Sequence, residues 1–137
     1  MHYQISLSDT VYGEFQGESP EAALAAYRHG QPWLDAVLDY LEANRDFLVD
    51  FARERMPRVA VGSPEGTYLA WMDCRKAELR TDPASFFLER AQVALSDGRR
   101  FGPGGEGFVR LNFGCPRPLL AQALEHMAAA LETHGPG

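Results

Sequence analysis

The residue with the clearest chemical use is Arg110, which lies within the alternating run 108–113 (FVRLNF). The alternation predicts a strand in which Val109, Leu111 and Phe113 face one side, so that Arg110 faces the other. A planar guanidinium can bind a carboxylate through two parallel hydrogen bonds. The residue pattern alone leaves two interpretations open: a carboxylate-binding arginine, or an ordinary half-exposed sheet arginine paired with a nearby acidic side chain.

The second candidate is the segment 97–107, which contains five glycines and leads directly into the Arg110 strand. A loop of this kind can shape the rim of a pocket. It lacks the strand-to-helix context and the glycine spacing of a nucleotide-binding loop, which argues against a phosphate cradle. The alternative interpretation is a flexible connection.

The other reactive residue types predict neither a metal site nor a catalytic centre. The histidines have no partner at helical ligand spacing, so structural or exposed roles are expected. The two cysteines lie far apart and require no disulfide, which favours a reducing cytoplasm as the location. A cysteine–histidine nucleophile pair stays open as an alternative, although no motif supports it. The residues concerned are His2, His29, His126, His134, Cys74 and Cys115.

Helical periodicity and capping residues predict the elements that would position these candidates. A short helix over 22–27 ends at Gly30, and a long helix runs from Pro32 to about Met56. Asp82 is expected to cap a further helix, and the last helix begins near 116–118. Strands are expected over 59–61, 67–73, 93–95 and 108–113.

The order of these elements predicts an α+β domain, with helices packed on a small mixed or antiparallel sheet. Residues 67–73 have apolar groups at both alternations, which indicates a central strand covered on both faces. The aromatic residues are assigned to the core; they are Tyr68, Trp71, Phe86, Phe87 and Phe113. Residues 1–20 read as an N-terminal arm or loop, and 21–137 as one domain.

Composition limits the class of function. With 137 residues, 45% hydrophobic and 23% charged, the chain fits a single globular domain. The net charge of −6 argues against nucleic-acid binding, and no apolar run is long enough to span a membrane. The 13 basic residues comprise twelve arginines and a single lysine, Lys76.

Three segments carry a resemblance to a known family: EAALAAYRHGQPWLDAVLDYLEANRDFLVDF, EGTYLAWMDCR and VALSDGRRFGPGGEGFVRLNFGCPRPLLAQAL. Together they resemble the C-terminal part of class I/II aminotransferase-like enzymes that depend on pyridoxal 5′-phosphate (PLP), closest to the cystathionine β-lyase or C–S lyase branch. The resemblance covers about residues 21–132, and 101–118 is its most specific part. It implies the small domain of a fold-type-I enzyme, in which Arg110 binds the α-carboxylate of an amino-acid substrate.

The sequence departs from this family where the cofactor chemistry resides. The family requires a lysine that forms a Schiff base with PLP, and Lys76 in DCRKAEL does not match it. The aspartate and tyrosine that contact the PLP ring have no counterparts, and the large cofactor domain is missing. We therefore expect a shortened gene product or half of a split enzyme, with no catalytic residue and no bound PLP of its own.

The resemblance implies two partners, an amino-acid substrate and the missing PLP-binding large domain. One alternative is a stand-alone, non-catalytic binding or dimerisation module that forms a homodimer. Another is an unrelated enzyme that uses Cys115 or the histidines.

Overall fold

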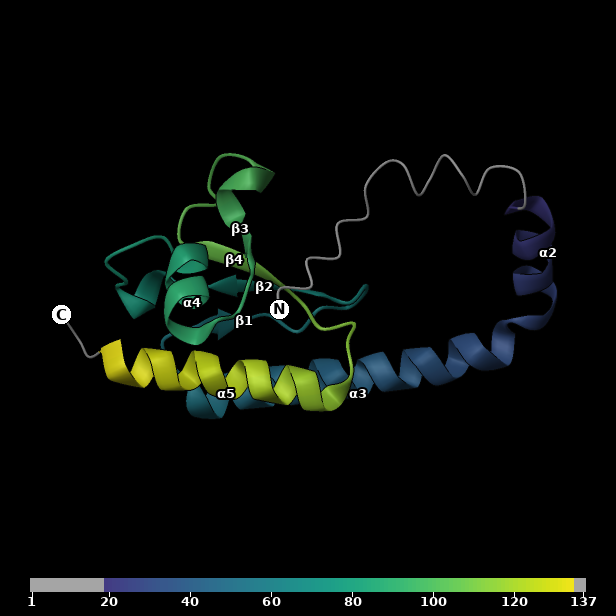
Figure 1. The fold of residues 1–137 in the computed structure, drawn as a ribbon, viewed down its shortest axis with the longest axis horizontal. Helices are drawn as coiled ribbons and strands as arrows, with labels where there is room; N and C mark the ends of the chain where they lie inside the picture. The colour runs from purple at the N-terminus through teal and green to yellow at the C-terminus, as the bar shows by residue number, and fades with distance from the viewer. Residues whose placement is uncertain (1–18, 135–137) are drawn as a thin grey trace. The chain divides into compact units, whose positions relative to one another are not determined.

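The computed structural model of the chain describes residues 19–134 (Figure 1). The predicted arm over residues 1–20 lies outside the described residues up to residue 18. The chain divides into two compact units, residues 1–38 and 39–137. The first contains α2 (Ser19–His29) and the beginning of α3 (Gln31–Arg55).

The second unit contains the rest of α3 and all the strands. In chain order the elements after α3 are β1 (Ala60–Val61), β2 (Leu69–Asp73), η2 (Arg75–Ala77), α4 (Pro83–Ala91), β3 (Ser96–Asp97), η3 (Gly98–Phe101), β4 (Phe108–Asn112) and α5 (Arg117–His134). The strands form one antiparallel sheet in the order β1-β2-β4-β3. The predicted α+β class is confirmed.

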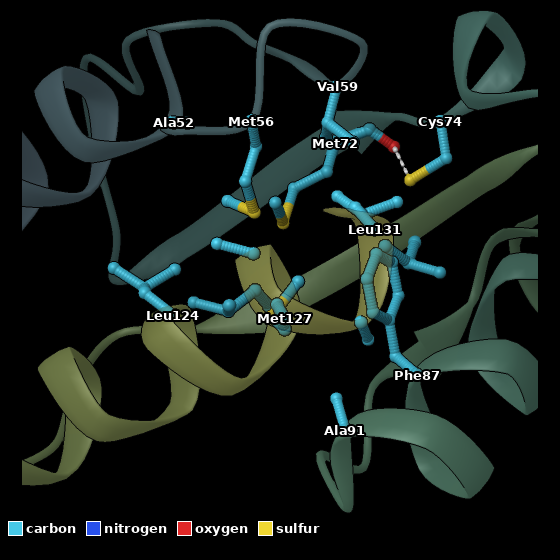
Figure 2. Close-up of a cluster of buried hydrophobic side chains, with 14 of the residues drawn as sticks. Ala52, Met56, Val59, Met72, Cys74, Phe87, Ala91, Leu124, Met127 and Leu131 are labelled. Carbon is cyan, nitrogen blue, oxygen red and sulfur yellow. Dashed lines mark hydrogen bonds between the residues drawn. The ribbon is translucent and has the colours of Figure 1, made fainter. Parts of the chain in front are cut away.

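The core lies on one face of this sheet, beneath the helices (Figure 2). Met72 of β2 and Val109 of β4 are fully buried there. The helices contribute Leu48 from α3, Phe87 from α4 and Met127 from α5, none of which is exposed to solvent. α4 also packs on α5 above this face.

The other face of the sheet corrects one sequence prediction. β2 is central, as expected, but it is covered on one face only, because all the helices that build the core pack on the same side. Ala70 and Met72 are buried, whereas Trp71 between them is 40% exposed. Trp71 and Tyr68 are therefore not core residues, although Phe86, Phe87 and Phe113 are.

The region around α4 gives one confirmation and one correction. The Asp82 carboxylate accepts a hydrogen bond from the Ser85 N–H (3.0 Å), so the predicted cap is present. The strand expected over 93–95 instead comprises Ser96 and Asp97. Its start is delayed because the Val93 N–H donates to the Phe87 carbonyl and thereby belongs to the end of α4. No helix within residues 19–134 is long and apolar enough to cross a membrane.

Candidate functional site

Arg110 lies in the middle of β4, on the sheet face opposite the helices. Its register partners are Trp71 on β2 and Ser96 on β3. The side chain therefore projects from the centre of the sheet face that the helices do not cover, which we call the open face. Its chain neighbours Val109 and Leu111 are buried in the core, as the alternation predicts. The side chain of Arg110 is only partly exposed.

The contacts of Arg110 involve an aromatic ring and a hydroxyl rather than a carboxylate. Its Cζ lies 4.5 Å from the centroid of the Phe101 ring, and its Nη2 lies 3.5 Å from Ser96 Oγ. Within residues 19–134 Arg110 makes no ion pair, which disfavours the interpretation of an ordinary paired sheet arginine. Because a stacked guanidinium still presents its N–H donors along its edge, this edge can accept a carboxylate.

Phe101 is one end of a row of aromatic rings across the open face. The Trp71 ring meets Phe101 edge to face at 5.5 Å and stacks on Phe108 at 5.6 Å. At the far end of the row, the Arg75 guanidinium lies 4.7 Å from the Phe108 centroid. Both ends of the row therefore carry an arginine.

The second arginine differs because its edge is already occupied. Arg75 donates to Asp73 through both Nε (2.9 Å) and Nη2 (2.7 Å). The hydrogen bond from Arg75 lowers the pKa of Asp73, and Asp73 in turn raises the pKa of Arg75. Arg75 is thus paired with the carboxylate at the end of β2, whereas Arg110 has no carboxylate partner among residues 19–134.

The glycine-rich segment is folded against itself rather than forming an open connection. The Asp97 carboxylate accepts hydrogen bonds from the Arg99 N–H (3.0 Å) and Nε (2.8 Å), and the Arg99 side chain lowers the pKa of Asp97. Gly98 and Gly105 approach so closely that a Cβ on either would collide with the backbone of the other. The loop thereby fixes Phe101, the last residue of η3, beside Arg110.

A shallow hollow of about 410 Å³ borders the aromatic row on the side of β1. Trp71 and Phe108 form one wall, and Leu69 and Pro64 contribute further apolar surface. Asp73 also lines it, but its carboxylate is held by Arg75. Arg110 does not line this hollow; the two are connected through Trp71, which lines the hollow and is the register partner of Arg110.

Sequence reasoning missed Asn44, a fully buried side chain on α3. Its Nδ2 donates to the carbonyls of Phe113 (2.9 Å) and Cys115 (2.8 Å), and its Oδ1 accepts from Arg117 Nε (2.7 Å). These bonds tie α3 to the turn that begins three residues after Arg110. The sequence does contain a signal for this role: Asn44 is a polar residue at a position where the helical spacing of Leu41 and Leu48 predicts an apolar one.

The cysteines and histidines form no reactive centre in the described part of the chain. Burial raises the pKa of the Cys74 thiol to about 12 and also raises that of Cys115, so neither is an activated nucleophile. The His134 ring packs against Phe86 at 5.2 Å, and His29 and His126 are exposed. Residues 19–134 contain no cluster of metal-ligating side chains; His2 lies outside the described residues.

The chain contains a single lysine. The lysine required for the Schiff base has only one candidate, Lys76, which is exposed on η2 after the end of β2. Its immediate neighbour in the chain is Arg75. The hydrogen bond from Arg75 is the main cause of the lowered pKa of Asp73, and the charge of Lys76 makes a smaller contribution.

No family model matches the chain, but individual proteins do. A putative cystathionine β-lyase of Mycobacterium leprae is 42% identical over 123 residues, which cover 80% of this chain and 31% of that protein. Cystathionine β-lyase PatB of Bacillus subtilis is 35% identical over 130 residues, which cover 94% of this chain and 34% of that protein. The chain thus spans about a third of the length of these relatives.

Solved structures agree with the sequence matches. A putative PLP-dependent β-cystathionase from Corynebacterium diphtheriae superposes with a TM-score of 0.75 at 40% identity, covering 79% of this chain and 29% of that one. A PLP-bound C–S lyase from Staphylococcus hominis gives a TM-score of 0.74 at 34% identity, covering 80% and 29%. The homologues of this chain are therefore cystathionine β-lyases and C–S lyases, PLP-dependent enzymes of fold type I, and the chain corresponds to their small C-terminal domain.

Proposed function

We propose that this chain is the substrate-binding part of a PLP-dependent C–S lyase or aminotransferase, in which Arg110 binds the α-carboxylate of the amino acid. The observation that carries the proposal is the free guanidinium edge of Arg110 on the open sheet face. A carboxylate there would receive two charge-assisted hydrogen bonds in a bidentate arrangement. The paired Arg75 at the other end of the row is unsuited to this role.

The cofactor and the Schiff-base lysine are proposed to come from another polypeptide segment. This is supported by the exposed position of Lys76 and by the third of the relatives' length that the chain spans. PLP supplies the electron sink for bond cleavage when it is bound in the complete enzyme. The chain's own part is to hold and orient the substrate through Arg110.

Two exposed apolar surfaces support a large partner domain. One is the aromatic row on the open sheet face. The other is the beginning of α3, where Leu34 and Leu38 are 42% and 53% exposed. Exposed apolar side chains of this kind mark surfaces that contact another chain or domain.

Reconstitution tests the proposal. The chain would be co-expressed with the part of Bacillus subtilis PatB that precedes its matched segment, and the complex assayed for PLP content and for β-elimination from cystathionine. We expect activity only in the complex, with Arg110→Ala lowering kcat/KM about 100-fold because two charged hydrogen bonds are lost. Arg75→Ala is the matched control and should stay within about twofold. Equal losses in the two variants would contradict the role of Arg110.

The chain alone is proposed to be inactive. After incubation with PLP and gel filtration it should retain no cofactor, and borohydride should fix none on Lys76. Stoichiometric labelling of Lys76 would contradict this part of the proposal. We further infer a cytoplasmic location, which the two unpaired cysteines, Cys74 and Cys115, support.

A second candidate is a non-catalytic module that associates with a copy of itself. The exposed aromatic residues Tyr27 and Trp33 at the N-terminal helices favour it. Sedimentation equilibrium would measure the dimer, and Trp33→Ala should weaken it. A strict monomer at high concentration would rule this candidate out.

A further inference from the structure

The ring of Phe101 lies over the Arg110 guanidinium. If Arg110 binds a carboxylate, as proposed above, this contact would orient the guanidinium for binding. An arginine side chain has several rotatable bonds, and fixing them costs conformational entropy when a ligand binds. A binding arginine is therefore more effective when it is held in place beforehand. The partners of Arg110 show how this is achieved.

Among the described residues, the ring of Phe101 makes the principal restraint on the guanidinium. The only hydrogen bond of the Arg110 side chain within residues 19–134, to Ser96 Oγ, has a length of 3.5 Å and is weak. The ring lies 4.5 Å from Cζ, well inside the range of a cation–π contact. Because an aromatic ring carries no net charge, it orients the cation without neutralising it.

Phe101 is in turn held by its own surroundings. Its edge meets Trp71 at 5.5 Å with the ring planes 82° apart. Its backbone ends η3, which Asp97 caps and which the close approach of Gly98 and Gly105 fixes. This support makes the position of the ring a property of the folded loop.

The exposure of Phe101 argues against a role in the core. The side chain is 51% exposed, whereas Phe87 and Phe113 are buried. A large apolar side chain that is held at the surface, over a free cation, is better explained by that cation than by packing.

We propose that Phe101 is a positioning residue for carboxylate binding, which fixes the plane of the Arg110 guanidinium and leaves its N–H edge free for the amino acid. The proposal rests on the proposed function of Arg110. On this proposal, the glycine-rich loop 97–107 functions to hold the Phe101 ring over the Arg110 strand. The proposal also distinguishes Arg110 from Arg75, whose orientation is set by a carboxylate that blocks its edge.

The test measures binding of L-alanine to the chain and its variants by NMR, following the Nε–H resonance of Arg110. Phe101→Leu keeps an apolar side chain but removes the ring, and should weaken binding about fivefold. Phe101→Tyr restores the ring and should bind within about twofold of the natural chain. The ring-current shift of the Arg110 side-chain protons should disappear in the first variant and persist in the second.

The control is Leu119→Ala, a similarly exposed apolar residue on α5 that lies outside this contact. It should change neither the binding nor the Arg110 resonance. Equal affinity of the natural chain and Phe101→Leu would overturn the role of Phe101 while preserving that of Arg110. An absence of binding in the natural chain, with its circular dichroism intact, would overturn both.

Discussion

The two faces of the sheet are built by the same strands, yet they differ in what covers them. On the helix-covered face, Met72 and Val109 are sealed beneath α3, α4 and α5. On the open face, Trp71 and Arg110 are register partners, and both remain partly exposed beside the ring of Phe101. Alternation along a strand thus places core residues on one face and the proposed binding residue, Arg110, on the other, so single substitutions can test the two faces separately.

The largest expected effect on stability comes from the covered face. Phe87→Ala should lower the free energy of unfolding by about 3–5 kcal/mol, because it removes a fully buried ring and leaves a cavity. Trp71→Ala on the open face should lower it by about 1–2 kcal/mol, since 40% of that side chain is exposed. Urea denaturation followed by circular dichroism measures both. Similar losses would contradict the division between the faces.

Next in size is the polar contact that joins α3 to the turn after β4. Asn44→Leu should cost about 2–3 kcal/mol, because the carbonyls of Phe113 and Cys115 lose their donor in a buried place. The matched control on the same helix is Arg53→Ala, an exposed ion-pair partner that should cost less than about 0.5 kcal/mol. The same chemical denaturation experiment applies, and a cost for Asn44→Leu no larger than the control's would show that the contact is dispensable.

A smaller effect is expected at the start of α4. Asp82→Ala removes the cap on the Ser85 N–H and should cost about 1 kcal/mol. Asp82→Asn keeps a capping oxygen and should recover most of the loss. Thermal melts of the two variants provide the measurement, and identical melting temperatures would argue against the cap.

The smallest expected effect is a pH dependence of stability. The backbone N–H of Ser85 lowers the pKa of Asp82, and Arg75 lowers that of Asp73. A carboxyl whose folded pKa lies below its unfolded value stabilises the fold at neutral pH. This contribution is lost as the pH falls below about 4, the unfolded value. Asp82→Asn should flatten the decline in melting temperature between about pH 5 and 3, and an unchanged slope would count against the assignment.

Local patterns predicted those features that depend on local interactions. The alternation of FVRLNF placed Arg110 opposite the core face, and the Asp82–Pro83 pair identified the start of α4. The resemblance to C–S lyases pointed to the same arginine. The predicted orientation of Arg110 on its strand and the predicted start of α4 are confirmed, because strand alternation and helix capping are decided within a few residues. The carboxylate-binding role of Arg110 stays a prediction.

The rest depends on contacts between distant segments. Nothing in LAWMD shows that only one face of β2 is covered, since that is decided by where three helices pack. The partners of Asn44 lie about 70 residues away, and Phe101 reaches Arg110 only because the glycine-rich loop folds back. The displaced start of β3 likewise reflects the end of α4 rather than the β-propensity of residues 93–95.

The central claim is that Arg110 recognises a carboxylate, and a comparison of two ligands tests it most directly. L-alanine and L-alaninamide differ only in that the second lacks the charged carboxylate. The account predicts that L-alanine shifts the Nε–H resonance of Arg110 and the backbone amide resonances of β4 with saturation, and that L-alaninamide does not. In Arg110→Lys the backbone amide shifts of β4 should no longer respond to L-alanine, because lysine lacks the bidentate edge. Equal titration by both ligands, or binding of L-alanine that persists in Arg110→Lys, would contradict it.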